Sequence, residues 1–370
     1  MPQVDYLKDF RDPRKIKAIA KQIEKEIKKP INIMEVCGGH THTIMKYGLN
    51  QILPPEINFV HGPGCPVCIM PKERIDHAIA LAQDEKNIVA TLGDMIRVPG
   101  SKSSLQKERA KGKNVKMLYA PFDILKIAKE NLDKNVIYFA IGFETTTPMT
   151  AALIEKVIKE KIKNVYFHIN HVLVPPPIKA IMDSGEAKID AFIGPAHVSV
   201  ITGAKIYQEI VDLYKTPVVI AGFEPVDIVE SVLWIVRQFN ENRVQVENQY
   251  RRAVTWEGNT KAQEIINRYL EPRENFRWRG IGDIPYSALK LKDKYSELDA
   301  EKVFADILPN EPINDHKLCI CGDILKGIAK PYECKVFGKS CTPQNPLGSC
   351  MVSSEGACAA YYRYGKLQLT

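Results

Sequence analysis

The feature that most limits how this chain can fold is a regular alternation of short β-branched runs with helical patterns. Each run ends in a glycine-rich or polar loop, and a segment with helical periodicity follows it. Strands that alternate with helices in this way form parallel sheets covered by helices on both faces. The sequence therefore predicts an α/β fold with eight strands, at residues 31–36, 57–60, 88–92, 115–119, 136–141, 165–169, 191–193 and 218–221.

A short internal similarity suggests how these strands are shared between domains. Gly142-Phe143-Glu144 follows the fifth run, and Gly222-Phe223-Glu224 follows the eighth. A chain of 370 residues is also longer than a domain with a single hydrophobic core usually is. We therefore expect two Rossmann-like α/β domains of about four strands each, with one doubly wound sheet as the alternative.

The other segments are predicted to be mainly helical or irregular. Amphipathic helical patterns occur at residues 12–28, 227–239, 260–270 and 300–308, and both periodicities fade from Cys319 onward. The expected organisation is an N-terminal helix within residues 1–30 that packs on the C-terminal part, an α/β domain at 31–130, a second at 131–225, and a helical, cysteine-rich domain at 226–370.

The charge pattern argues against several classes of partner. The chain has 51 basic and 44 acidic residues, and lysines and glutamates are interspersed along the predicted helices. This pattern indicates solvated helix faces, so we expect no nucleic-acid partner. The N-terminus lacks the apolar core of a secretory signal, and the apolar runs are too short to span a membrane. With nine cysteines and no export signal, we expect a cytoplasmic protein.

Two cysteines with Cys-x-x-Cys spacing, Cys65 and Cys68, follow the second predicted strand after a tight Gly-Pro-Gly turn. In a strand-to-helix setting this spacing indicates a redox pair. Half of a structural zinc site and two unconnected buried thiols are the alternatives.

A third cysteine, Cys37, stands at the end of the first predicted strand, close to His40 and His42. Ligands bind beyond the carboxyl ends of strands in open α/β sheets, and thiols and imidazoles suit metals. Because Asp94 follows the third strand, we expect these groups and the Cys65–Cys68 pair to meet at one edge of one sheet. The alternative is a buried strand-end thiol, with His40 as a neighbour of a helix cap.

The second predicted domain carries weaker signals. The three threonines at 145–147 open a helix, where they could hold an anion such as a nucleotide phosphate or act only as helix caps. His168, His171 and His197 follow strand ends and could line a cleft between the domains.

Six of the nine cysteines fall within forty residues near the C-terminus. Their spacing contains no paired C-x2-C knuckle, which disfavours zinc. A segment with little core of its own and this many thiols is usually held together by metal, and four thiolates suit a [4Fe–4S] cluster with two cysteines left over. Spacing alone does not select the four ligands from Cys319, Cys321, Cys334, Cys341, Cys350 and Cys358.

Six blocks of the sequence together resemble the HypD family of hydrogenase maturation factors. They are residues 35–42 (EVCGGHTH), 62–68 (GPGCPVC), 142–148 (GFETTTP), 170–172 (NHV), 194–197 (GPAH) and 351–358 (MVSSEGAC). The blocks keep the family's order, from about residue 30 to the C-terminus. The resemblance implies a scaffold that assembles the Fe(CN)2CO unit of [NiFe]-hydrogenases together with two partners, HypC and HypE.

The resemblance also implies roles at the first site. Cys37 would bind the iron jointly with the N-terminal cysteine of HypC, and HypE would deliver cyanide. Cys65 and Cys68 would be an exchangeable pair beside the iron, and His40 and Asp94 fall on motif positions at that site.

The family's cluster region is similar to that of ferredoxin:thioredoxin reductase, with four ligands and a neighbouring dithiol. On that likeness, Cys321 and Cys350 form a second redox pair, and the expected cluster ligands are Cys319, Cys334, Cys341 and Cys358.

Two other functions fit the same residues. An iron–sulfur thiol–disulfide oxidoreductase that acts on a partner protein would carry no iron at Cys37, and a zinc-stabilised interaction module would have no redox chemistry. An iron that carries cyanide and carbon monoxide favours thiolate donors and a supply of electrons, which the predicted cluster and dithiols would provide. The scaffold is therefore the predicted function.

Overall fold

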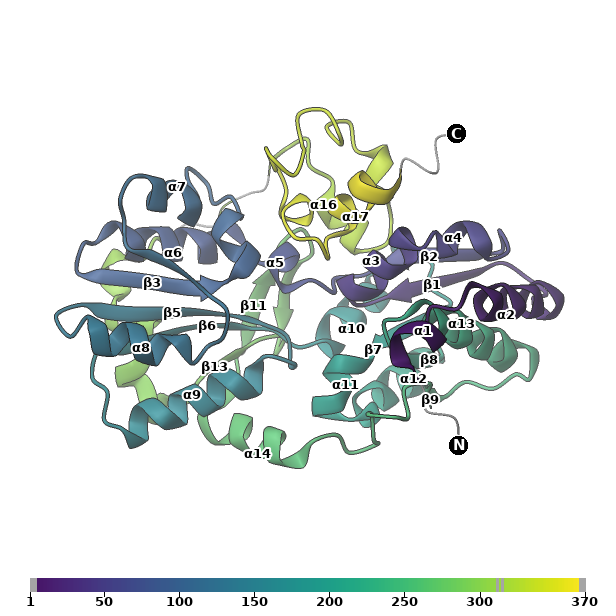
Figure 1. The fold of residues 1–370 in the computed structure, drawn as a ribbon, viewed down its shortest axis with the longest axis horizontal. Helices are drawn as coiled ribbons and strands as arrows, with labels where there is room; N and C mark the ends of the chain where they lie inside the picture. The colour runs from purple at the N-terminus through teal and green to yellow at the C-terminus, as the bar shows by residue number, and fades with distance from the viewer. Residues whose placement is uncertain (1–4, 311–312, 314–315, 366–370) are drawn as a thin grey trace.

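The computed structural model describes residues 5–310, 313 and 316–365, and all eight expected strands are present in it. They form two parallel sheets whose strands point their carboxyl ends toward the middle of the molecule (Figure 1). The cysteine-rich C-terminal segment lies above the junction of the two sheets (Figure 1). The α/β prediction is confirmed.

The first sheet has five parallel strands, and its order is β2 (Ile57–His61), β1 (Ile31–Glu35), β7 (Ala191–Pro195), β8 (Val218–Ala221) and β9 (Val246–Asn248). The second has four, in the order β4 (Val115–Leu118), β3 (Asn87–Leu92), β5 (Asn135–Gly142) and β6 (Val165–His171). The order of the first four strands of each sheet follows the same scheme, second-first-third-fourth along the chain.

The expected grouping into consecutive sets of four strands is wrong. Strand β1 pairs with β7, Ile33 opposite Ala191, so the chain leaves the first sheet after β2 and returns to it only at β7. The cause is that strand pairing depends on contacts between distant segments, whereas the sequence pattern that located the strands is local. The two Gly-Phe-Glu segments follow the third strand of one sheet and the fourth of the other, so they are not equivalent positions.

Helices cover both sheets and connect their strands. In chain order they are α1 (Tyr6–Asp9), α2 (Pro13–Glu26), α3 (Gly38–Lys46), α4 (Leu49–Ile52), α5 (Pro66–Ile69), α6 (Lys72–Gln83), η1 (Gly93–Arg97), α7 (Leu105–Ala110), α8 (Asp123–Glu130), α9 (Thr147–Lys159), α10 (Pro175–Ser184), α11 (Ala196–Thr202), η2 (Ala204–Tyr207), α12 (Gln208–Tyr214), α13 (Pro225–Asn240) and α14 (Thr260–Tyr269). The C-terminal part adds η3 (Asp293–Leu298), α15 (Ala300–Val303), η4 (Ala305–Ile307), α16 (Cys321–Leu325), η5 (Pro331–Glu333), η6 (Ser349–Met351) and α17 (Ala357–Tyr364).

The helices expected outside the strand region are found, although the one expected at 300–308 is divided into α15 and η4. Asp12 caps α2 by accepting a hydrogen bond from the amide of Arg14, and Ile16 and Ile23 bury its apolar face. This helix packs on α13, where Glu26 forms an ion pair with Arg237. The sequence did not predict β9, nor two antiparallel pairs, β10 (Leu270–Pro272) with β13 (Leu289–Leu291) and β11 (Asn275–Trp278) with β12 (Gly282–Pro285).

A largely buried ionic network fastens the C-terminal half to the second sheet. The carboxylate of Glu301 in α15 forms ion pairs with Arg74 of α6 and with Arg273. Arg74 also donates to the side chain of Asn170 in β6, at 2.6 Å. Burial alone would raise the pKa of Glu301, but the two guanidinium groups hold that pKa well below its usual value.

Replacing Glu301 with glutamine should therefore destabilise the fold by about 3 to 5 kcal/mol at neutral pH, because two buried guanidinium groups would lose their shared anion. The loss should shrink as the pH falls below the ordinary glutamate pKa, since the stabilisation needs the ionised carboxylate. Urea denaturation at several pH values measures both effects. The exposed control Glu297→Gln should change stability by less than about 0.5 kcal/mol.

No helix among the residues that the structure describes is both long enough and apolar enough to cross a membrane.

Candidate functional site

The two loops that carry Cys37 and Cys65 lie directly against each other. Cys37 precedes α3, and its carbonyl accepts a hydrogen bond from the amide of His40 at 3.0 Å. A Cβ atom on Gly64 would lie 2.2 Å from the Cα of Cys37, so only glycine permits this contact. Gly38 is pressed equally closely against Glu355 of the C-terminal segment. The glycines around the cysteines therefore bring three chain segments together at one place.

Cys37 is buried, and the side chain of His197 contacts it from another segment. The Nε2 atom of His197 lies 3.9 Å from the Sγ atom of Cys37. Burial raises the pKa of the Cys37 thiol well above its usual value, and the negative charge of Glu355 raises it further. A metal that binds Cys37 would have to displace this proton.

The two histidines singled out beside Cys37 have other hydrogen-bond partners. Nε2 of His40 lies 3.2 Å from the carbonyl oxygen of Ala221 and 3.1 Å from that of Gly222. Burial lowers the pKa of His40 to about 4, so the ring is neutral, and its Nδ1 has no partner among the described residues. His42 bonds the carbonyl of Ser354 at 3.3 Å.

The imidazole next to the thiol is thus His197, which the sequence marked only weakly. Its ring stands 4.7 Å from that of Phe223, which also stacks on His40 at 4.6 Å. The sequence signal that could have identified His197 is its position just after the end of β7, the strand that pairs with β1.

Asp94 reaches this region from the opposite sheet, so the expectation that all these groups share one sheet is wrong. Asp94 follows β3 of the second sheet and accepts a hydrogen bond from Arg97 at 2.8 Å. Partial desolvation raises the pKa of Glu355, and the charge of Asp94 raises it further. The site is therefore formed where the edges of both sheets meet the C-terminal segment.

A buried polar chain that the sequence did not reveal joins α17 to the same strands. Oε1 of Glu35 accepts from the Thr41 hydroxyl at 2.6 Å and also contacts Nδ1 of His61. Nε2 of His61 lies 3.0 Å from the hydroxyl oxygen of Tyr361. Helix α17 also carries Cys358, so this chain fixes the cysteine-rich segment relative to Cys37 and Cys65.

Four cysteines form a connected row, which we call the thiol row: Cys321, Cys350, Cys68 and Cys65. Cys350 has hydrogen-bond contacts with Cys321 on one side and Cys68 on the other, and these lower the pKa of Cys350 to about 6. Burial raises the pKa of Cys68 well above its usual value, and contacts with Cys350 and Cys65 raise it further. Ser349 locks the two segments together, since its hydroxyl donates to the carbonyl of Cys68 at 2.5 Å. The row therefore joins a thiolate to a neutral thiol across two chain segments.

A second group of thiols, which we call the cysteine cage, surrounds a small enclosed cavity. Its cysteines are Cys319, Cys321, Cys334, Cys341 and Cys358. Four of these five cysteines are the predicted cluster ligands, and the remaining one is Cys321, which was predicted to belong to a redox pair. Cys350 does not line the cavity, and it lies toward Cys68.

The cage suits an iron–sulfur cluster by the chemistry of its donors. All of its potential ligands are thiols, and Ile324, Val336 and Met351 add apolar surface around them. Gly348 leaves room beside the sulfurs, because a Cβ atom there would lie 2.7 Å from the Sγ atom of Cys319. Within the described ranges, no three histidine, cysteine, aspartate or glutamate side chains are placed to hold a single metal ion.

Two of the three threonines after β5 form hydrogen bonds within their own turn, whereas the buried hydroxyl of Thr145 has no hydrogen-bond partner among the described residues. The hydroxyls of Thr146 and Thr147 donate to the carbonyl of Phe143, at 3.2 and 3.0 Å, which favours the local structural interpretation over anion binding. Glu144, which directly precedes the three threonines, is buried, and its Oε1 accepts a hydrogen bond from the amide of Val174 at 2.9 Å. Burial raises the pKa of Glu144 to about 7.

Replacing Glu144 with glutamine should stabilise the fold in a pH-dependent way. The pKa of Glu144 is about 7 in the folded protein and ordinarily 4.5, so ionisation opposes folding as the pH rises between these values. The stability difference between Glu144→Gln and the wild type should grow over this window, to about 3 kcal/mol at most, and level off above it. Urea denaturation from pH 4.5 to 8 measures it, and a constant difference would contradict the assignment.

Two facing parallel α/β sheets with a buried thiol centre at their junction define a class of two-domain α/β proteins built around clustered cysteines. The comparisons with known proteins identify the family within that class. The HypD family model, described as "Hydrogenase formation hypA family", matches residues 14–365. The chain belongs to this family.

Full-length relatives agree with that assignment. The chain is 49% identical to the hydrogenase maturation factor HypD of Azotobacter vinelandii, over 98% of this chain and 97% of the relative. It is 48% identical to that of Rhizobium leguminosarum bv. viciae, over 98% and 96%. It is 39% identical to that of Escherichia coli K12, over 97% and 98%.

Proposed function

We propose that this protein is a hydrogenase maturation scaffold on which the Fe(CN)2CO unit of [NiFe]-hydrogenases is assembled, together with HypC and HypE. Membership of the HypD family supports the role in hydrogenase maturation. The observation that carries the finer proposal is the thiol row, because it leads from the cysteine cage to the loop packed against Cys37.

In this proposal the iron is the substrate, and Cys37 is its ligand on this chain. A soft thiolate suits a low-spin iron that carries cyanide and carbon monoxide. HypC would supply a second cysteine, and HypE would bring the cyanide groups. His197 lies next to the Cys37 sulfur, and burial lowers the pKa of His197 to about 4, so it faces the thiol as a neutral imidazole that helps to position it. His40 positions the loop through its bonds to Ala221 and Gly222.

The thiol row supports a two-electron exchange between two cysteine pairs. The Cys350 thiolate would attack the Sγ atom of Cys68 in a Cys65–Cys68 disulfide and release Cys65 as a thiolate. Cys321 would then lose its proton and attack Cys350, which releases Cys68. The Cys65–Cys68 pair becomes a dithiol, the Cys321–Cys350 pair becomes a disulfide, and no electrons are left over.

A resident [4Fe–4S] cluster, held by Cys319, Cys334, Cys341 and Cys358, would supply single electrons that return the Cys321–Cys350 pair to its reduced state. The all-thiol cage favours this cofactor over a harder ion. The proposal places the protein in the reducing cytoplasm, where nine unpaired cysteines are expected to persist.

The second candidate is an iron–sulfur thiol–disulfide oxidoreductase that acts on a partner protein. The low pKa of Cys350 favours thiol exchange in either case, so this observation does not separate the two functions. Iron at Cys37 does separate them, because the oxidoreductase needs none.

The deciding experiment is purification without oxygen, alone and after co-expression with HypC and HypE, followed by metal analysis and infrared spectroscopy of the same samples. We expect about four irons in the protein alone, and one further iron with cyanide and carbon monoxide bands in the complex. Iron without these bands would favour the oxidoreductase, and zinc without them would favour the interaction module.

A further inference from the structure

Two adjoining cavities lie between the sheets, away from the cysteines. One has a volume of about 280 Å³ and the other about 580 Å³. Both are lined by Glu144, Leu173, Thr202 and Ile206, so they meet at these four residues. We call the combined space the interdomain groove. The iron and thiol chemistry described above makes no use of it.

Glu144 stands at the junction of the groove and has an unused hydrogen-bonding atom. Its side chain is 94% buried, since only 6% of the residue's surface is exposed. Oε1 accepts from the amide of Val174, but Oε2 has no partner in another described residue. A buried carboxyl oxygen without a donor is unfavourable, which indicates that a donor from outside the chain completes the site.

The charges around the groove are mainly negative. Its lining contains four carboxylates, Glu144, Asp183, Glu209 and Glu271, against two lysines. Lys179 pairs with Glu209 within the lining, and Lys205 pairs with Glu257 at 2.5 Å. Glu271 pairs with Lys290 at 3.2 Å, so Glu144 and Asp183 are the lining carboxylates that have no ion pair among the described residues. This local excess of acid occurs in a chain with a net charge of +7, so the groove favours a positively charged occupant.

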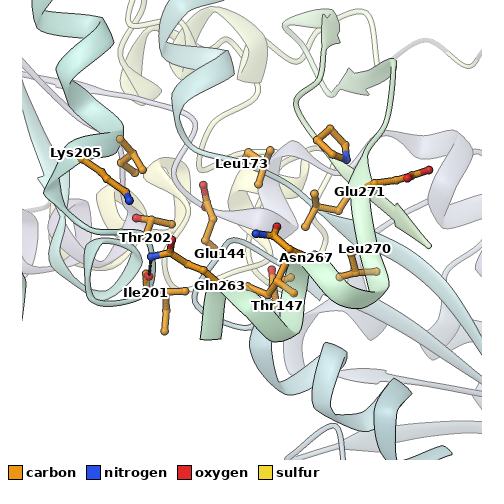
Figure 2. Close-up of a pocket in the computed structure, with 14 residues that line it drawn as sticks. Glu144, Thr147, Leu173, Ile201, Thr202, Lys205, Gln263, Asn267, Leu270 and Glu271 are labelled. Carbon is orange, nitrogen blue, oxygen red and sulfur yellow. Dashed lines mark hydrogen bonds between the residues drawn. The ribbon is translucent and has the colours of Figure 1, made fainter. Parts of the chain in front are cut away.

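The walls next to Glu144 are apolar. Leu173, Ile206 and Leu270 border the smaller cavity, and Asn267 projects from α14 on the same side (Figure 2). In Figure 2 the carboxyl group of Glu144 lies between Leu173 and Thr202. An occupant at the junction therefore meets the carboxyl group of Glu144 with the hydrocarbon of Leu173 and Ile206 beside it.

We propose that the interdomain groove is a binding site for a small organic cation, whose protonated amino or amidino group donates a hydrogen bond to Oε2 of Glu144. Its aliphatic or aromatic body packs on Leu173 and Ile206. A charge-assisted hydrogen bond in a place shielded from water gives the selectivity for a cation. The site is separate from Cys37 and from the cysteine cage, and it does not depend on the presence of iron.

The test is isothermal titration calorimetry of the purified full-length protein at pH 8 with 4-phenylbutylamine and its neutral analogue 4-phenylbutanol. We expect saturable one-to-one binding of the amine and at least about tenfold weaker binding of the alcohol. Glu144→Gln keeps the acceptor for Val174 and should weaken binding of the amine at least about tenfold. The exposed control Glu297→Gln should leave the affinity unchanged.

A second variant tests the location independently of the charge. Ile206→Phe fills the junction of the two cavities and should weaken the binding of the amine, although Glu144 is unchanged. The proposal is overturned if the amine does not bind saturably, if amine and alcohol bind equally, or if both variants retain wild-type affinity. Thermal midpoints of the variants confirm that each one is folded.

Discussion

Under the proposed function, replacing Cys37 with serine should remove the cyanide and carbon monoxide bands that we expect from the complex with HypC and HypE. A hydroxyl is a harder and less acidic donor than a thiol, so it does not replace a thiolate on low-spin iron. The Cys37 sulfur lies 3.9 Å from Nε2 of His197, and the Cys37 backbone is pressed against Gly64, so the position of this sulfur is fixed by its surroundings. Infrared spectroscopy and iron analysis of the anaerobically purified complex provide the measurement.

The control for this variant is built into the protein. Cys37 is not part of the cysteine cage, so Cys37→Ser should keep the visible absorption and the content of about four irons per chain that the proposed iron–sulfur cluster would give. If the variant still carried iron with cyanide bands, the assignment of Cys37 would be wrong. If it lost the cluster as well, misfolding would be the explanation, and the milder Cys37→Ala would be needed.

The second large effect is expected from variants of the proposed Cys321–Cys350 redox pair, because the loss of each cysteine should stop the exchange at a different step. In Cys321→Ser, Cys350 still attacks Cys68, but no thiol remains to resolve the product, so a Cys350–Cys68 mixed disulfide should accumulate. In Cys350→Ser the attacking thiolate is absent, so the Cys65–Cys68 disulfide should stay intact. Mass spectrometry of peptides after alkylation distinguishes the two products, and each variant serves as the matched control of the other.

The pH dependence of this exchange follows from the same contacts. Hydrogen bonds from Cys321 and Cys68 lower the pKa of Cys350 to about 6, so the attacking thiolate forms as the pH rises through this value. In Cys321→Ser the rate of mixed-disulfide formation should rise with pH and level off once the Cys350 thiolate is fully formed, at a pH above about 6, because this variant lacks the Cys321 thiol whose hydrogen bond lowers the Cys350 pKa most. Equal amounts of mixed disulfide in both variants, or a Cys350–Cys65 bond in place of Cys350–Cys68, would contradict the proposed order of attack.

Much of the site could be predicted because its signals are local. The glycines before Cys65 and after Cys37 permit close backbone contacts that a side chain would block. Because these glycines are adjacent to the cysteines in the sequence, the motif itself indicates the site. The sequence could not identify His197 as a site residue in the same way. Its contact with Cys37 depends on the pairing of β1 with β7, and the sequence pattern carries no information about which distant strands become neighbours.

Asp94 illustrates the same limit from the other side. Its position after a strand was correctly read, but the strand belongs to the opposite sheet. The row from Cys321 to Cys65 likewise joins segments that are more than 250 residues apart. The order within that row follows from the packing of η6 against α5, where Ser349 bonds the carbonyl of Cys68.

The sequence by itself determined the secondary structure of the α/β core, the family and the set of cysteines, because periodicity, turn chemistry and motifs are written in neighbouring residues. Only the tertiary structure decided which strands share a sheet, that His197 and not His40 faces Cys37, and that Cys350 lies next to both Cys321 and Cys68. The physical reason is that pairing and burial are collective. They arise from contacts among residues far apart in the chain, and the lowest free energy is a property of the packed whole.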